Sequence, residues 1–136
     1  MSNLTPLQNL HYAIGELAYA IARADGKVQK EERFAFGEMV TQELENKNYA
    51  FDISAIIFSI MEKDQAKLPD SYHSAIRQIH LNSHYLSPAI KKKFITVIEK
   101  VAAAYPPVTV AERHLIKKFK KDIEHIEGDP VFYRDT

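Results

Sequence analysis

The chain has 136 residues, the size of one domain with room for a hydrophobic core, and we treat residues 1–136 as a single domain. Its 18 basic and 18 acidic residues cancel, so no overall charge favours nucleic acid or an anionic membrane as a partner. Cysteine is absent, which excludes disulfides, thiolate zinc sites and cysteine nucleophiles. The sequence shows no signal-peptide pattern and no apolar run of membrane-spanning length, so we expect a soluble cytoplasmic protein.

Apolar residues recur at helical spacing along the whole chain, and no segment alternates for long enough to predict a strand. Thr5, Pro6 and Gln8 form the pattern of a capping box that opens a first helix, and Gly26 is expected to close it. Five further helices are predicted in chain order: from about Gln29 to Asn46, after Asp52, from Pro69-Asp70, from Ser87-Pro88, and from Thr109 to Gly128. The sequence therefore predicts an all-α bundle of about six to seven helices.

Two details of this prediction concern packing. Asp52 is expected to cap the third helix, and the buried face of that helix is assigned to its isoleucines: Ile53, Ile56, Ile57 and Ile60. At the C-terminus, the apolar trio Val131-Phe132-Tyr133 is expected to fold back onto the helices, with docking on a second chain as the alternative.

Two segments of the chain share the same outline of a helix end, a turn and a new helix start. The shared residues are separated by a constant eighty positions: Ala22, Ala24, Val28, Glu32 and Arg33 recur as Ala102, Ala104, Val108, Glu112 and Arg113. A fixed offset of this kind indicates internal duplication. We therefore predict two pseudo-repeated helical hairpins, at about residues 14–44 and 94–124.

The two turns differ in the residues that form them. The first contains Asp25-Gly26, whereas the second contains Tyr105-Pro106-Pro107. The two prolines are expected to end the preceding helix near Ala104 and to present the tyrosine ring on a stiff corner. This second turn is therefore predicted to be a packing or partner surface, and the Asp25-Gly26 turn is the one of the two that can hold an ion.

An EF-hand is the first interpretation to test for the first turn. With Gly26 at the sixth loop position, Asp25 and Glu32 fall on the fifth and twelfth positions, as calcium ligation requires. The first and third positions, however, are Ile21 and Arg23, which replace two oxygen donors with an apolar side chain and a cation. The EF-hand interpretation therefore fails.

The block at residues 17–33, together with its degenerate copy at residues 97–113, resembles the tellurite-resistance TerB-like family of small helical proteins. This resemblance implies an all-α fold, a bacterial cytoplasmic setting, a stress-response or metal-related role, and no established catalysis. It also implies a cluster of acidic residues at the turn that is proposed to bind a metal cation. The matching residues are Asp25 and Glu32, with Glu31 beside them and Glu112 from the second segment.

Two interpretations of these carboxylates remain open. Glu32 and Glu112 each fall at the third position of a helix, where a glutamate caps the helix and favours the positive end of its dipole. Alternatively, Asp25 and Glu32 lie together on an exposed rim and hold a divalent cation, calcium or magnesium in preference to zinc. The first interpretation predicts a metal-free module that binds a protein partner or forms a homodimer, and the second a module that binds or senses a cation.

Four side chains are expected on one face of the fourth helix: His73, Arg77, His80 and His84. The guanidinium among them opposes a bound cation, so this face is interpreted as solvated, with an anion or a partner contact as the first alternative and a metal ion as the last. The aromatic residues near the lysine runs, Phe94 and Phe119, fall in the apolar register, which argues against nucleic-acid binding. No catalytic motif is present, and we expect no enzymatic activity.

Overall fold

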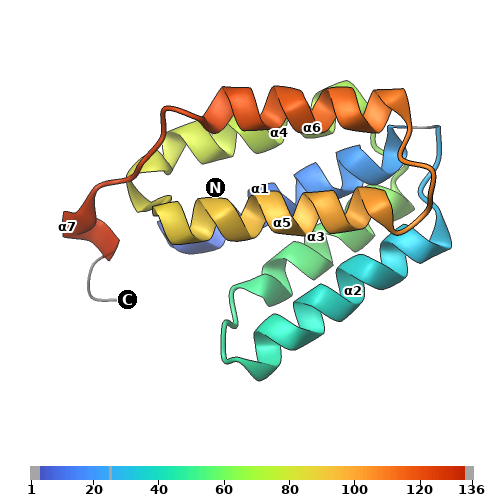
Figure 1. The fold of residues 1–136 in the computed structure, drawn as a ribbon. Coiled ribbons are helices and arrows are strands. Elements are labelled where there is room, and N and C mark those ends of the chain that lie inside the picture. The colour runs from blue at the N-terminus through green and yellow to red at the C-terminus, as the bar shows by residue number, and fades with distance from the viewer. Residues whose placement is uncertain (1–3, 25, 134–136) are drawn as a thin grey trace.

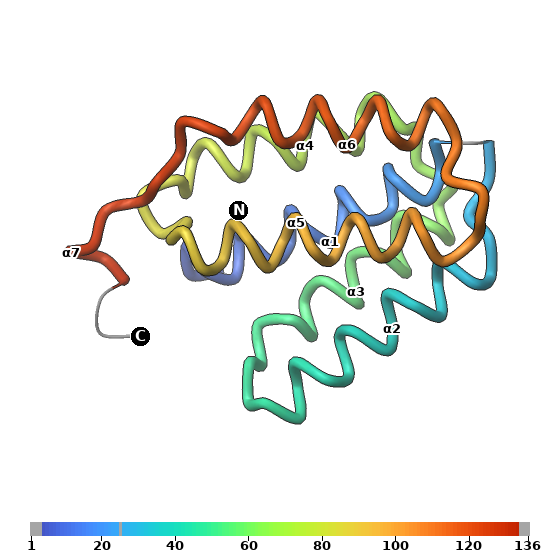
Figure 2. Tube along the Cα trace, in the orientation of Figure 1, coloured from blue at the N-terminus to red at the C-terminus, as the bar shows by residue number. Residues whose placement is uncertain are grey.

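A computed structural model describes residues 4–24 and 26–133. Within them, the structure contains seven α-helices, one short 3-10 helix and no strand, which confirms the all-α prediction (Figures 1 and 2). The elements in chain order are α1 (Pro6–Arg23), α2 (Lys30–Glu45), α3 (Phe51–Lys63), α4 (Leu68–Leu81), η1 (Ser83–Tyr85), α5 (Pro88–Ala103), α6 (Val110–Ile123) and α7 (Pro130–Tyr133). None of the described helices combines the length and apolar composition needed to span a lipid bilayer.

Helix α1 is the centre of the fold. It packs against α3, α4, α5 and α6, and α2 reaches the bundle mainly through α3 and α5 (Figure 1). Every residue from Ala13 to Ala22 is buried, so this helix has no solvated face over nearly three turns. Alanines alternate here with large aliphatic side chains, and this mixture lets neighbouring helices approach α1 from several sides.

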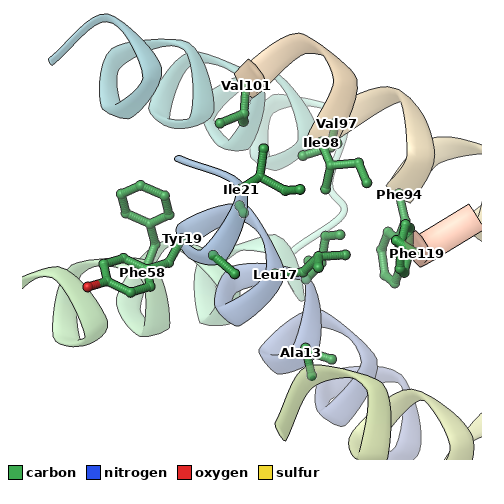
Figure 3. Close-up of a cluster of buried hydrophobic side chains, with 14 of the residues drawn as sticks. Ala13, Leu17, Tyr19, Ile21, Phe58, Phe94, Val97, Ile98, Val101 and Phe119 are labelled. Atoms are coloured by element: carbon green, nitrogen blue, oxygen red, sulfur yellow. The ribbon is translucent and has the colours of Figure 1, made fainter. Parts of the chain in front are cut away.

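One hydrophobic core joins helices α1 to α6. Figure 3 shows Leu17 and Ile21 of α1 directed toward the apolar side chains of α5, including Ile98 and Val101. On α1 as well, Tyr19 packs edge-to-face against Phe58 of α3, with 6.1 Å between the ring centroids. Burial of these large side chains is the main source of stability for a helical bundle of this size.

Helices α1 and α3 cross in direct backbone contact at Gly15. A Cβ atom at this position would lie 2.5 Å from the carbonyl oxygen of Ser54 and 3.0 Å from its Cα. The Ser54 side chain is itself buried and donates a hydrogen bond to the Phe51 carbonyl at 2.6 Å. The crossing therefore requires a residue without a side chain on α1.

The predictions for α3 are corrected in two respects. Its N-cap is Ala50, and Asp52 lies inside the first turn. Of the four isoleucines, Ile57 is buried, whereas Ile56 and Ile60 are 51% and 46% exposed. The buried face instead follows Phe51, Ser54 and Phe58, because the close crossing with α1 fixes which side of α3 points inward.

The C-terminal part of the chain leaves the bundle after α6, which ends at Ile123 and not at Gly128. Gly128 has φ +72° and passes the Leu86 backbone so closely that a Cβ would lie 2.7 Å from its carbonyl oxygen. The Phe132 ring then packs against His84, with a centroid separation of 4.8 Å, while Val131 stays exposed. The expected fold-back thus holds for Phe132 and is wrong for Val131.

Candidate functional site

The first turn joins α1 to α2, and Asp25 within it lies outside the described residues. Glu32 is fully buried, and its Oε1 accepts a hydrogen bond from the backbone N–H of Gln29 at 3.0 Å. The prediction that Glu32 lies on an exposed rim is therefore wrong, because the capping position turns its carboxylate inward. Glu31, the neighbouring residue, is exposed on the first turn of α2.

The second turn, between α5 and α6, contains the same arrangement. Glu112 is fully buried, and its Oε1 accepts hydrogen bonds from the Thr109 backbone N–H at 2.9 Å and from the Thr109 hydroxyl at 3.0 Å. The Thr109 hydroxyl oxygen in turn accepts from the Glu112 N–H at 3.1 Å. Each glutamate therefore completes a capping box, as the first of the two interpretations predicts.

The local geometry of the two turns follows the eighty-residue offset. The helices before them have Ala24 and Ala104 as their C-caps, whose N–H groups bond to the carbonyls of Ile21 and Val101. The helices after them begin at the two capping boxes. Whether the complete segments 14–44 and 94–124 superpose, and whether this reflects a TerB-like repeat, stays a prediction.

Two of the four predicted cation ligands at the turns are buried. Of the four predicted ligands, Glu32 and Glu112 each have one oxygen engaged by the backbone and no exposed surface. In the described part of the chain, no three His, Asp or Glu side chains are grouped in a way that would hold a metal ion. The metal-binding role of Asp25 and Glu31 stays a prediction.

The charges beside the first turn are predominantly positive. A hollow of about 290 Å³ next to Gly26 is lined by the cations Arg23 and Lys27 and by Glu62. Glu62 forms an ion pair with Arg33 of α2, so its charge is compensated. Arg23 donates to the Tyr19 hydroxyl at 2.8 Å, which fixes its guanidinium at this hollow. A cation entering here would meet two like charges.

A second hollow, of about 690 Å³, lies between the start of α2 and the end of α5. We call it the Phe34 notch, and its lining consists of Lys30, Glu31, Arg33, Phe34, Ala35, Glu38 and Ala104. Phe34 is 68% exposed although it lies on a helix whose other aromatic residue, Phe36, is buried in the core. A large aromatic ring left in solvent at a hollow is a typical feature of a protein contact site.

The corner after α5 lies next to this notch. As predicted from the prolines, α5 ends at Ala103 with Ala104 as its C-cap. Tyr105 comes directly after Ala104 and keeps more than a third of its surface exposed. The peptide bond between Pro106 and Pro107, which come next, is cis. The α5 end therefore contributes apolar surface to the same end of the molecule as Phe34 (Figure 1).

The predicted histidine face is only partly formed. His73, Arg77 and His80 are exposed on α4, but His84 lies in η1 and packs between the rings of Tyr85 and Phe132. The placement of His84 on the fourth helix is wrong, because α4 ends at Leu81 and the chain then turns into the 3-10 helix.

Two buried ionisable residues on α1 were not recognised in the sequence. Glu16 and His11 are each only 2% exposed. Burial raises the pKa of Glu16 to about 7, against an opposing hydrogen bond with Ser74. Oε1 of Glu16 is sealed from solvent and has no hydrogen-bond partner among the described residues. Burial lowers the pKa of His11. Both residues lie within the apolar pattern Leu10–Ile21, and this position was the sign in the sequence that they could be buried.

Comparison with known proteins identifies neither a family nor a function for the chain. The chain matches no protein family, no curated protein and no solved structure. The resemblance to the TerB-like family rests on the sequence block alone and stays a prediction.

Proposed function

We propose that the protein is a non-enzymatic, metal-free helical module that binds another protein through the Phe34 notch. The observation that supports this proposal is the exposure of Phe34 beside a hollow with an apolar floor of Ala35 and Ala104. The capping role of Glu32 and Glu112 supports the metal-free part of the proposal, since one oxygen of each carboxylate is engaged by the backbone of its own helix start.

The charges around the notch indicate the chemistry of the partner. Glu31 and Glu38 flank Phe34 on the same side of α2 and form no ion pair with any described residue. Arg33 is engaged by Glu62, which leaves Lys30 as the one cation of the lining without an acidic partner among the described residues. A partner segment with an apolar side chain next to Lys or Arg would complement this surface.

Panning a peptide-display library against the purified protein tests the proposal. We expect wild type to enrich peptides in which an apolar residue stands beside Lys or Arg. The Phe34→Ser variant should bind these peptides at least about fivefold more weakly, because a contact residue of this kind contributes more than about 1 kcal/mol. Tyr49→Ser is the matched control, because Tyr49 is 66% exposed outside the notch. Equal binding to wild type and Phe34→Ser would contradict the proposal.

The cation alternative is tested separately by titration calorimetry with Ca²⁺ and with Mg²⁺. We expect no saturable heat for wild type, because the carboxylates of Glu32 and Glu112 are buried in their capping boxes. Saturable binding that Asp25→Asn abolishes would show instead that the first turn holds a cation, and the metal-free proposal would then be abandoned.

A further inference from the structure

A small cavity of about 110 Å³ lies where the start of α1 meets the loop before α3 and the start of α5. Leu7, Ile90 and Phe94 form its apolar side, and His11, Asn48 and Lys93 supply its polar groups. It is separate from the Phe34 notch and shares no lining residue with it.

The hydrogen bonds of His11 define what its ring offers to the cavity. Its Nδ1 lies 2.9 Å from the carbonyl oxygen of Leu7, and because a carbonyl only accepts, Nδ1 carries the proton. Burial, reinforced by the charge of Lys93, lowers the His11 pKa, so the ring is neutral at pH 7 and Nε2 carries a lone pair. Nε2 has no partner among the described residues and is not one of their sealed unpaired atoms. It therefore keeps accessible surface, and the His11 side chain lines the cavity.

Each of the other two polar side chains has one donor engaged by Glu43. Lys93 donates to Oε1 of Glu43 at 2.7 Å, and the amide nitrogen of Asn48 donates to the same oxygen at 3.0 Å. Burial alone would raise the Glu43 pKa, but these two bonds lower it and keep Glu43 ionised. For a ligand this leaves two acceptors, Nε2 of His11 and the amide oxygen of Asn48, together with the remaining N–H groups of Asn48 and Lys93.

Water alone is a poor occupant of such a cavity. At about 30 Å³ per molecule, its volume corresponds to roughly three or four waters, each of which needs two to four polar partners. The apolar side of the cavity, formed by Leu7, Ile90 and Phe94, offers those waters no partner. An ion is also disfavoured, because the charges of Lys93 and Glu43 compensate each other and leave no net charge beside the cavity to hold it.

We propose that this cavity is a binding site for a small neutral molecule with an apolar body and one hydrogen-bond donor, such as a phenol or a short alcohol. The hydroxyl donates to Nε2 of His11, and the body packs against Leu7, Ile90 and Phe94. The rings of Phe51 and Phe94, at 4.5 and 5.3 Å from the His11 ring, hold the imidazole in place for this contact.

The test is a titration with phenol and with benzene, followed through the His11 ring signals by NMR. Phenol should shift them saturably and bind about fivefold more tightly than benzene, the difference expected for one net hydrogen bond of about 1 kcal/mol. In His11→Phe, which keeps an aromatic ring but removes the acceptor, the preference should disappear when binding is followed through the amide signals of neighbouring residues. No saturation by phenol, equal affinity for phenol and benzene in wild type, or an unchanged preference in His11→Phe would overturn the proposal.

Two further variants keep the test decisive. Leu7→Phe fills the apolar side of the cavity and leaves His11 in place, so it should lose binding of phenol even if His11→Phe does not fold. Phe34→Ser alters only the distant notch and should bind phenol as wild type does. Retained phenol binding in Leu7→Phe would place the ligand elsewhere and contradict the assignment.

Discussion

Replacing Glu16 with glutamine is expected to raise the free energy of unfolding at pH 9 by up to about 3 kcal/mol relative to wild type. The Glu16 pKa rises from its ordinary value of 4.5 to about 7 on folding, because burial disfavours the carboxylate. The folded state therefore holds this proton more tightly than the unfolded chain. Its contribution to stability is complete below pH 4.5 and is lost as the pH rises through 7.

Urea denaturation of both proteins at pH 5, 7 and 9 measures this effect. The difference between wild type and Glu16→Gln removes the contribution of other titrating groups, including His11, whose lowered pKa acts with the opposite sign. Glu45→Gln, at an exposed position of α2, is the matched control. A difference between wild type and Glu16→Gln that stays constant from pH 5 to 9 would mean that Glu16 titrates as an exposed carboxyl does.

Gly15→Ala is expected to lower the free energy of unfolding by about 2–3 kcal/mol, despite the higher helix propensity of alanine. The added methyl would lie 2.5 Å from the Ser54 carbonyl oxygen, so α1 and α3 would have to separate. A shift of these two helices also disturbs the side chains packed around their crossing.

Gly37→Ala is the matched control for this substitution. Gly37 lies in the exposed interior of α2, with no atom within 4 Å of a Cβ built on it. The same chemical change should therefore stabilise the protein there, by about 0.5–1 kcal/mol. Thermal and urea unfolding of the two variants should move in opposite directions. A stabilised Gly15→Ala would show that the helices do not cross in backbone contact.

The features that the sequence predicted correctly depend on neighbouring residues in the chain. The capping box of Thr5 and the N-caps Ser87 and Thr109 are formed as expected. Such caps are short-range interactions between a side chain and amides two or three residues away, so their pattern is visible in one dimension. The end of α5 before Pro106 follows for the same reason.

The features that the sequence did not predict depend on contacts between distant segments. The isoleucines of α3 are compatible with more than one buried face of this helix. The close crossing of α1 and α3 at Gly15 and Ser54 decides which face is buried. Glu32 and Glu112 were located correctly along the helix, but whether a capping carboxylate faces solvent or core depends on the neighbouring helices. The Phe34 notch likewise arises from two helices more than sixty positions apart.

The central position of α1 also has a consequence during synthesis. This helix leaves the ribosome before the other described helices of the bundle, and α5 and α6, which cover part of it, end at residues 103 and 123. At about 5–20 residues per second, roughly 5–20 s pass between the synthesis of α1 and that of the helices that enclose it. During that interval the stretch from Ala13 to Ala22 is not yet covered by all of the helices that bury it in the folded protein. Nascent chains stalled before α5 should therefore depend on chaperones far more than the finished protein does.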